Sequence, residues 1–123
     1  ALPYTRKVIE GLQSEGAPVL LYVRQSASRL EAMAASGCTG LSIDDSLTLA
    51  QARARLAAGT VLQGNLDPAH LAAPAGRMRE LVHAMIDEAG PTGTIINLAR
   101  GLTPATPPEG VAAFVQAVQE WTQ

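Results

Sequence analysis

Two short segments of the chain gather polar side chains that can bind an anion or orient a ligand. Gln63–Pro68 reads QGNLDP after an apolar run, and Thr94–Pro108 reads TIINLARGLTPATPP, with Arg100 just beyond its apolar start. Amides and carboxylates orient ligands through hydrogen bonds, and a guanidinium binds a carboxylate through two parallel N–H groups. Both segments place these groups beyond the carboxyl end of a predicted strand, where α/β folds build their sites.

The two earlier predicted strands also end in polar residues. Because the carboxyl ends of parallel strands share one face of a barrel, the sequence predicts a single site there. The candidates at the strand ends are Arg24, Gln25, Asp44, Asp45, Gln63, Asn65, Asp67, Asn97 and Arg100. Those that we expect to bind the substrate are Arg100, Asn97, Gln63, Arg24 and Asp44.

Several of these residues also have a purely structural interpretation. Asp44 and Asp67 can cap turns, and Arg24 can pair with Asp44. For Asn65–Pro68, turn chemistry is the favoured interpretation, since Asn and Asp bond their own backbone before a proline. Arg100 and the last helix's N-terminus can instead hold carboxylates of a polyacidic ligand.

The histidines and the cysteine do not form a recognisable site. His70 and His83 are expected on helix surfaces, and Cys38 is expected to pack beside a helix end. No His/Cys spacing fits zinc, and no glycine-rich loop fits a nucleotide phosphate. We therefore expect neither a metal nor another cofactor.

The elements that position the candidates alternate between helix and strand. Strands are predicted at Pro18–Val23, Gly40–Ile43, Thr60–Gln63 and Thr94–Leu98. The first predicted helix runs from Pro3 to Gly16 and has its apolar positions at Val8, Ile9 and Leu12. The second begins at a cap on Ser26 or Ser28 and ends at Gly37. The other helices are predicted over Leu49–Leu56, over about 77–89, and from Pro107 to Trp121. The alternation predicts an α/β domain over residues 1–123 with a parallel sheet. Pro18–Val23 is continuously apolar, which is typical of a strand buried on both faces.

Length, charge and composition argue against several classes of fold and function. With 123 residues the chain is one domain and too short for a complete (β/α)8 barrel of roughly 250 residues. A net charge of −2 without a basic cluster argues against nucleic acid as a partner. No apolar run approaches the length of about 20 residues that spans a bilayer, so we expect no membrane partner. The single cysteine fits a reducing compartment, and we expect a cytoplasmic protein.

Four strands make either a small open sheet or half of a barrel, and the pattern does not choose between the two. A half barrel leaves two parallel edge strands unpaired and one apolar face uncovered. A second copy related by a two-fold axis is the simplest cover, so we expect a homodimer.

Several segments resemble the C-terminal part of the uroporphyrinogen decarboxylase family. Leu30–Cys38 reads LEAMAASGC and resembles the family's LEAMAATGC, while Gln63–Pro68 and Asn97–Pro108 are the most specific matches. The likeness extends over nearly the whole chain. It implies the last four βα units of a (β/α)8 barrel, hence a parallel-stranded half TIM barrel with a leading helix, completed by a second copy or by a missing N-terminal half.

The resemblance also implies an activity, the cofactor-free decarboxylation of uroporphyrinogen acetates to coproporphyrinogen in haem biosynthesis. In the family, the aspartate that binds the pyrrole nitrogens and an arginine-rich loop lie in the N-terminal half. We therefore expect little or no activity from the isolated chain. The alternative is a non-catalytic module that binds a tetrapyrrole or another polyacid, or that acts only in assembly.

Three motifs depart from the family pattern. Asn97–Gly101 stands where the family has Asn-Leu-Gly-His-Gly, so Arg100 replaces a histidine. Ser42–Asp45 stands where the family resembles GLDW, so the tryptophan is lost. Arg24–Ser26 stands where the family usually has a lysine and glycines. An arginine binds carboxylates but is permanently charged, which makes Arg100 a poor acid.

Overall fold

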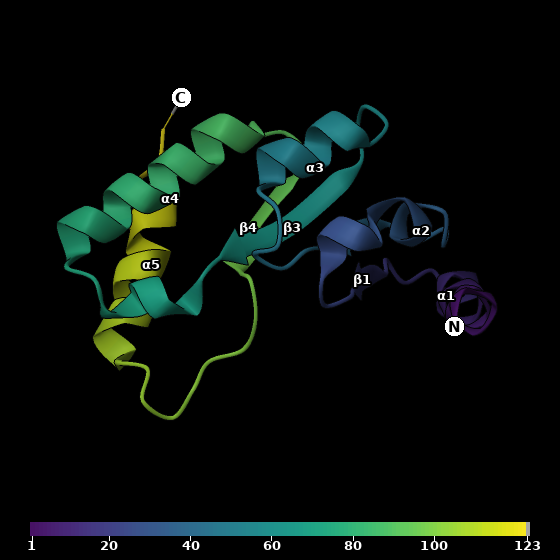
Figure 1. The fold of residues 1–123 in the computed structure, drawn as a ribbon, viewed down its shortest axis with the longest axis horizontal. Coiled ribbons are helices and arrows are strands. Elements are labelled where there is room, and N and C mark those ends of the chain that lie inside the picture. The colour runs from purple at the N-terminus through teal and green to yellow at the C-terminus, as the bar shows by residue number, and fades with distance from the viewer. Residues whose placement is uncertain (123) are drawn as a thin grey trace.

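The computed structural model describes residues 1–122, which form a sheet with helices between its strands (Figure 1). The strands are β1 (Leu20–Tyr22), β2 (Gly40–Ser42), β3 (Val61–Leu66) and β4 (Thr94–Leu98). The helices are α1 (Leu2–Ser14), α2 (Leu30–Ala34), α3 (Leu49–Arg55), α4 (Ala75–Ala89) and α5 (Pro108–Glu120), with the 3₁₀ turns η1 (Ser26–Ser28) and η2 (Pro68–Ala72). The order is β1-β2-β3-β4, and every neighbouring pair is parallel. The predicted βα alternation is confirmed.

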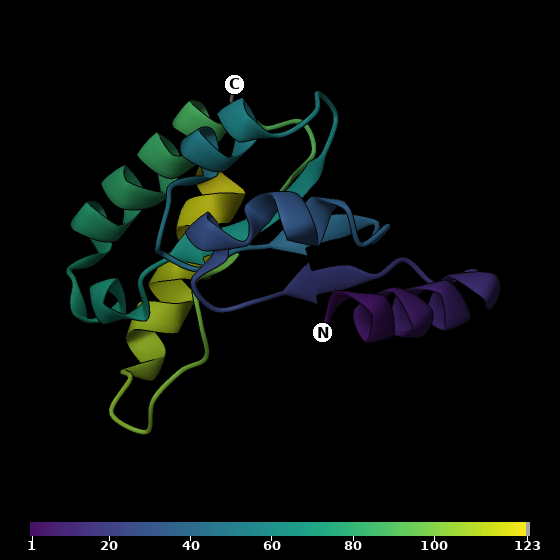
Figure 2. The ribbon, with the colours of Figure 1, turned by 45° about the vertical axis from the view of Figure 1, so that its right-hand side comes forward.

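Apolar side chains fill the space between the sheet and the helices on one face. Leu41 of β2 and Leu62 of β3 point into this core from neighbouring strands. Met78 and Val82 of α4 pack with Phe114 of α5 in a second cluster over the β3–β4 side. Figure 2 shows α2, α3 and α4 on the same side of the strands. This rigid layer holds the strand ends in place.

The opposite face of the sheet is open. Leu20, Tyr22 and Ile95 are each 41–42% exposed there, while Leu21 packs on the helix side. The prediction that Pro18–Val23 is buried on both faces was therefore wrong. The strand is short, and alternate side chains meet a helix layer on one face and no protein on the other.

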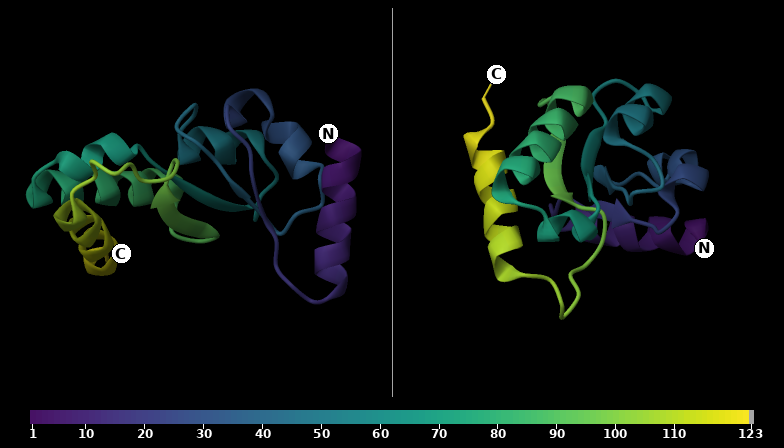
Figure 3. Two further views of the ribbon diagram at one scale, coloured as in Figure 1. Left: turned by 90° about the horizontal axis from the view of Figure 1, so that it is seen from below. Right: turned by 60° about the vertical axis from the view of Figure 1, so that its left-hand side comes forward.

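α1 presents an apolar stripe to the surface. Tyr4, Val8 and Leu12 lie four residues apart, so they share one side of the helix, and they are 47–74% exposed. Of the three apolar positions Val8, Ile9 and Leu12, only Ile9 is buried. The predicted helix is confirmed, and two of its three apolar positions face the surface. α1 and α5 lie at opposite ends of the molecule (Figure 3).

Local hydrogen bonds set the helix starts. At α3, the Thr48 hydroxyl accepts from the Gln51 N–H at 3.0 Å, and the Gln51 side chain accepts from the Thr48 N–H at 2.9 Å. The predicted serine cap of α2 was wrong. The Ser26 hydroxyl donates to a carbonyl at the end of β1 at 2.6 Å and accepts from the Asp44 N–H, so it organises the loop, and the residue at the helix cap position is Arg29.

β3 is longer than the predicted Thr60–Gln63 and extends to Leu66. Gly64 permits this, because its φ is +145° and a Cβ there would come 2.9 Å from the Ile43 carbonyl oxygen of the neighbouring chain segment. The extension carries Asn65 to the carboxyl end of the sheet. In the described part of the chain, no helix is long and apolar enough to cross a bilayer.

Candidate functional site

Arg100 lies just beyond β4 and joins two carboxylates from neighbouring loops. Its Nη1 donates to Asp45 Oδ2 at 2.6 Å, and its Nη2 donates to Asp67 Oδ1 at 2.8 Å. The hydrogen bond and charge of Asp45 raise the pKa of Arg100, with a smaller contribution from Asp67. The loops that follow β2, β3 and β4 are thus tied by one guanidinium, and the three charges sum to −1.

Asp44 ties the loop after β1 to the loop after β2. Its Oδ2 accepts from the Gln25 N–H at 2.6 Å, and its Oδ1 accepts from the Ser26 N–H at 3.2 Å. The Ser46 N–H and hydroxyl donate to the same Oδ1 at 3.2 and 2.5 Å. Burial acts to raise the pKa of Asp44, but the hydrogen bonds from Ser46, Gln25 and Ser26 outweigh it and lower the pKa to about 2. The turn-capping interpretation describes Asp44, whereas the pairing of Arg24 with Asp44 was wrong.

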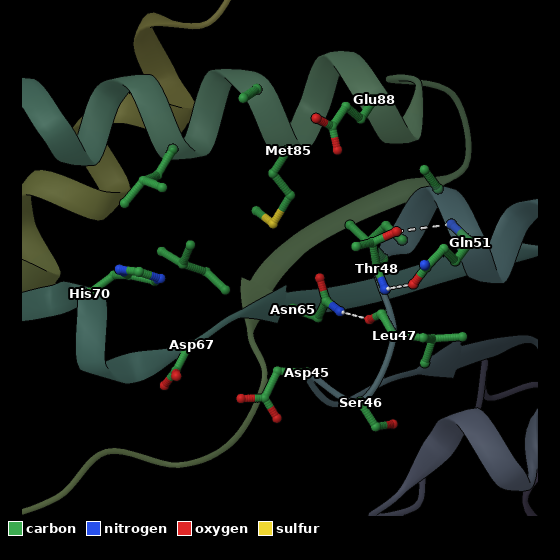
Figure 4. A pocket seen from close by; sticks show the side chains of 15 residues that line it. Asp45, Ser46, Leu47, Thr48, Gln51, Asn65, Asp67, His70, Met85 and Glu88 are labelled. Atoms are coloured by element: carbon green, nitrogen blue, oxygen red, sulfur yellow. Dashed lines mark hydrogen bonds between the residues drawn. The ribbon is translucent and has the colours of Figure 1, made fainter.

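Asn65 and Asp67 connect loops in different ways. The Asn65 amide donates to the carbonyl oxygen of Asp44 at 3.0 Å. It also donates to the carbonyl oxygen of Leu47 at 2.6 Å (Figure 4). It therefore bridges to another loop, and the prediction that it bonds its own turn was wrong. Asp67 does follow the turn prediction, because its Oδ1 accepts from the Ala69 N–H at 3.0 Å.

Gln63 and Asn97 lie on strands that border the open face. The Gln63 amide donates to the Ser42 hydroxyl on β2 at 3.0 Å. Asn97 is exposed, and its Oδ1 accepts from the next backbone N–H at 2.8 Å. Tyr22, which sequence reasoning passed over, donates from its hydroxyl to the Ala99 carbonyl at 3.2 Å, so it reaches from β1 to the end of β4. Strict alternation from Leu20 is the signal that places Tyr22 on this face.

A separate hollow of about 470 Å³ lies on the helix side of the sheet, between α3 and α4 (Figure 4). Met85 points into it from α4, with Gln51 and Glu88 at one end. His70 and Asp67 lie toward the other end. The sheet lies between this hollow and the open face, and Asp45 and Asp67, which pair with Arg100, line the hollow as well.

The remaining candidates have structural surroundings. His70 is exposed, as predicted, whereas His83 is partly buried with its Nε2 2.9 Å from the Ala117 carbonyl oxygen. Cys38 is partly buried beside α2, as expected for packing. Within residues 1–122, no group of three or more His, Cys, Asp or Glu side chains is arranged to hold a metal ion.

The comparison with known proteins matches this arrangement to a family. A sequence model of the family described as Uroporphyrinogen decarboxylase (URO-D) matches residues 1–121. The chain belongs to the uroporphyrinogen decarboxylase family. It is 38% identical over 127 residues to the uroporphyrinogen decarboxylase of Idiomarina loihiensis, covering 99% of this chain and 36% of that protein. It is 39% identical over 126 residues to that of Vibrio cholerae, covering 98% of this chain and 36% of that protein.

These figures also show how much of a family member the chain represents. It spans about a third of the length of the curated uroporphyrinogen decarboxylases that it matches. A solved methyltransferase from Methanosarcina mazei shares the fold, with a TM-score of 0.81 at 20% identity over 97% of this chain and 35% of that one. The fold is a parallel-stranded half of a TIM barrel, as predicted.

Two of the departures from the uroporphyrinogen decarboxylase pattern lie in contact. Asp45 stands at the tryptophan position of the GLDW-like segment, and Arg100 stands at the histidine position. These two side chains form the 2.6 Å ion pair. Where the resemblance places a bulky apolar group and a titratable ring, this chain has one charged pair, which Asp67 extends.

Proposed function

We propose that this chain supplies the C-terminal half of a uroporphyrinogen decarboxylase site in a cytoplasmic enzyme of haem biosynthesis. The observation that carries the proposal is the family match over residues 1–121, together with polar groups at every strand end of the half barrel. The reaction is a carboxy-lyase step without a cofactor. A protonated pyrrole ring accepts the electron pair as an acetate carboxylate leaves as CO2, and the remaining methylene takes a proton to become a methyl group.

The side chains on the open face are suited to binding the substrate. Gln63 and Asn97 offer amide groups, and Asn97 is exposed. Arg100 is accessible, but both edges of its guanidinium already donate to Asp45 and Asp67. We therefore assign Arg100 the role of positioning the loops rather than that of moving a proton, because a guanidinium does not titrate near neutral pH.

Completion of the barrel is part of the proposal. The occupant that we propose for the open face is the other (β/α)4 half of the same family, because the curated relatives are almost three times as long as the matched region. The stripe Tyr4–Leu12 on α1 would meet that half at the β1 edge. Leu102 and Val115, which are also exposed apolar residues, would meet it at the β4 edge.

The test is uroporphyrinogen turnover, with the products separated by their number of carboxylates. The chain is assayed alone and after co-expression with the N-terminal half of the Vibrio cholerae relative. We expect no turnover alone, and stepwise loss of carboxylates from a one-to-one complex whose mass is measured by sedimentation. Replacing Gln63 with Leu should lower turnover, while Gln116→Leu on the surface of α5 should not.

The other outcomes decide between the remaining hypotheses. A complex without turnover would support the non-catalytic module that binds a tetrapyrrole or another polyacid, which the replacement of the histidine by Arg100 favours. A chain that sediments as a dimer by itself would support the homodimer expected from the edge strands. A monomer that forms no complex would refute the proposed completion.

A further inference from the structure

Two arginines lie beside one another at the carboxyl end of β1. Arg29 Nη1 donates to the Arg24 carbonyl oxygen at 3.1 Å and to Gln25 Oε1 at 3.4 Å. Arg24, Gln25 and Arg29 are exposed, and together with Val23 they line an open hollow of about 590 Å³. Both arginines therefore line the same accessible space.

Four of the other exposed arginines form ion pairs, and a fifth, Arg6, donates to the Ala35 carbonyl oxygen. Ion pairs join Arg55 to Glu31, Arg77 to Glu80, Arg79 to Glu120, and Arg100 to Asp45 and Asp67. Across residues 1–122, neither Arg24 nor Arg29 has a carboxylate within ion-pair distance. Asp44 contacts their loop, but its oxygens accept from backbone N–H groups and from Ser46. The positive charge at this corner of the site is left for a ligand.

The loop that carries these arginines is held in one conformation. Gln25 has a φ of +56°, in the left-handed region, and its N–H donates to Asp44. The Ala27 N–H donates to the Ser46 hydroxyl at 3.0 Å. A loop fixed in this way loses little freedom when a ligand binds, so more of the contact energy appears as affinity.

We propose that Arg24 and Arg29 form a binding site for an anion that carries two or more carboxylates. A guanidinium holds a carboxylate through two parallel N–H groups, and two such groups around one hollow favour a polycarboxylate over a single carboxylate. The identification of that anion as a porphyrinogen rests on the proposed function. The anion site itself does not, because it requires neither the completed barrel nor turnover.

The experiment is a calorimetric titration of the chain with mellitate, a benzene ring that carries six carboxylates, at low salt and pH 7.5. Arg24→Gln and Arg29→Gln should each weaken binding roughly fivefold, and the double variant more than tenfold. Benzoate, with one carboxylate, should bind more weakly than mellitate. Arg77→Gln removes an equal charge from α4 and should leave the affinity for mellitate within about twofold of the parent value.

The outcomes separate this site from general attraction and from the proposed function. Equal affinities for the parent chain and Arg24→Gln would overturn the site, as would an equal loss in Arg77→Gln. Arg29 supports the loop through the Arg24 carbonyl, so Arg24→Gln is the variant that removes a charge and leaves that hydrogen bond in place. Mellitate binding that depends on Arg24, together with no decarboxylation by the complex with the N-terminal half, would keep this inference and refute the proposed activity. Turnover in a completed barrel, with a mellitate affinity that Arg24→Gln does not change, would support the proposed activity and refute the anion site.

Discussion

The substitution Asp44→Asn removes a charge from the loops of the half barrel while keeping the size of the side chain. In the parent chain, one carboxylate oxygen accepts from Gln25 and the other accepts from Ser26 and twice from Ser46. Asn has only one acceptor oxygen, so its NH2 group must face at least one of these donors. Losing one such charge-assisted hydrogen bond costs about 1.5–3 kcal/mol.

The pKa of Asp44 gives a second measure of the same effect. A lowering from 3.8 to about 2 corresponds to about 2 kcal/mol of stability, at about 1.4 kcal/mol for each pKa unit. Because the pKa is lower in the folded chain than in the unfolded chain, this stability is fully present above about pH 4. It is lost as the pH falls through about 2. The two values agree, so we expect Asp44→Asn to lower the free energy of unfolding by about 2 kcal/mol at pH 7.

Urea unfolding followed by far-UV circular dichroism measures this difference at pH 7 and again near pH 2.5. Asp87→Asn is the matched control, since exposed Asp87 accepts only from the Trp121 indole N–H at 2.8 Å and an amide oxygen can keep that bond. Asp87→Asn should change the free energy of unfolding by no more than about 0.5 kcal/mol. The reasoning is refuted if Asp44→Asn is as stable as the parent at pH 7, or if the difference is the same at both pH values.

Two further stability predictions rest on contacts between helices and strands. A Cβ at Gly110 would lie 1.8 Å from a carbonyl oxygen of η2, so Gly110→Ala should destabilise the chain by at least about 2 kcal/mol. Gly76 in α4 has open space around it, so Gly76→Ala should be neutral or stabilise by up to about 1 kcal/mol, and equal urea midpoints for both variants would contradict this. Arg53 donates to three carbonyl oxygens and to the Thr94 hydroxyl, so Arg53→Met should cost about 2–3 kcal/mol by leaving partly buried acceptors unpaired. Arg77→Met breaks only a surface ion pair and should change the free energy of unfolding by less than about 1 kcal/mol; thermal melts that rank the two arginine variants the other way would contradict the prediction.

The positions of the strands were predictable because each apolar run is bounded by glycine, proline or polar residues. β4 has the predicted bounds Thr94–Leu98, and proline and glycine marked the ends of most helices. What covers an apolar side chain was not predictable. Periodicity identifies Val8 and Leu20 as apolar, but their burial depends on segments that lie across the sheet or beyond it.

In the candidate site, too, the local sequence predicts where residues lie along the chain but does not predict their contacts. Its residues were found because they follow strands, but their pairing depends on the path of the loops. Arg100 meets partners 55 and 33 residues earlier in the sequence, and no local pattern predicts such contacts. Arg29 was missed for the opposite reason, because it lies near the start of a predicted helix, where an arginine is typical of a solvent-exposed surface.

The hydrogen bond from the Tyr22 hydroxyl to the Ala99 carbonyl joins residues 77 positions apart, whereas the backbone pairing of the sheet joins only consecutive strands. Each βα unit can therefore add to the previous one during folding, but this bond can form only after the last strand has docked and the sheet has curved. Contacts with such long sequence separation form slowly, because the intervening chain must be ordered first. The phenol of Tyr22 is thus a reporter for the last step in shaping the half barrel, and Tyr22→Phe should accelerate unfolding while leaving the earlier steps of folding unchanged.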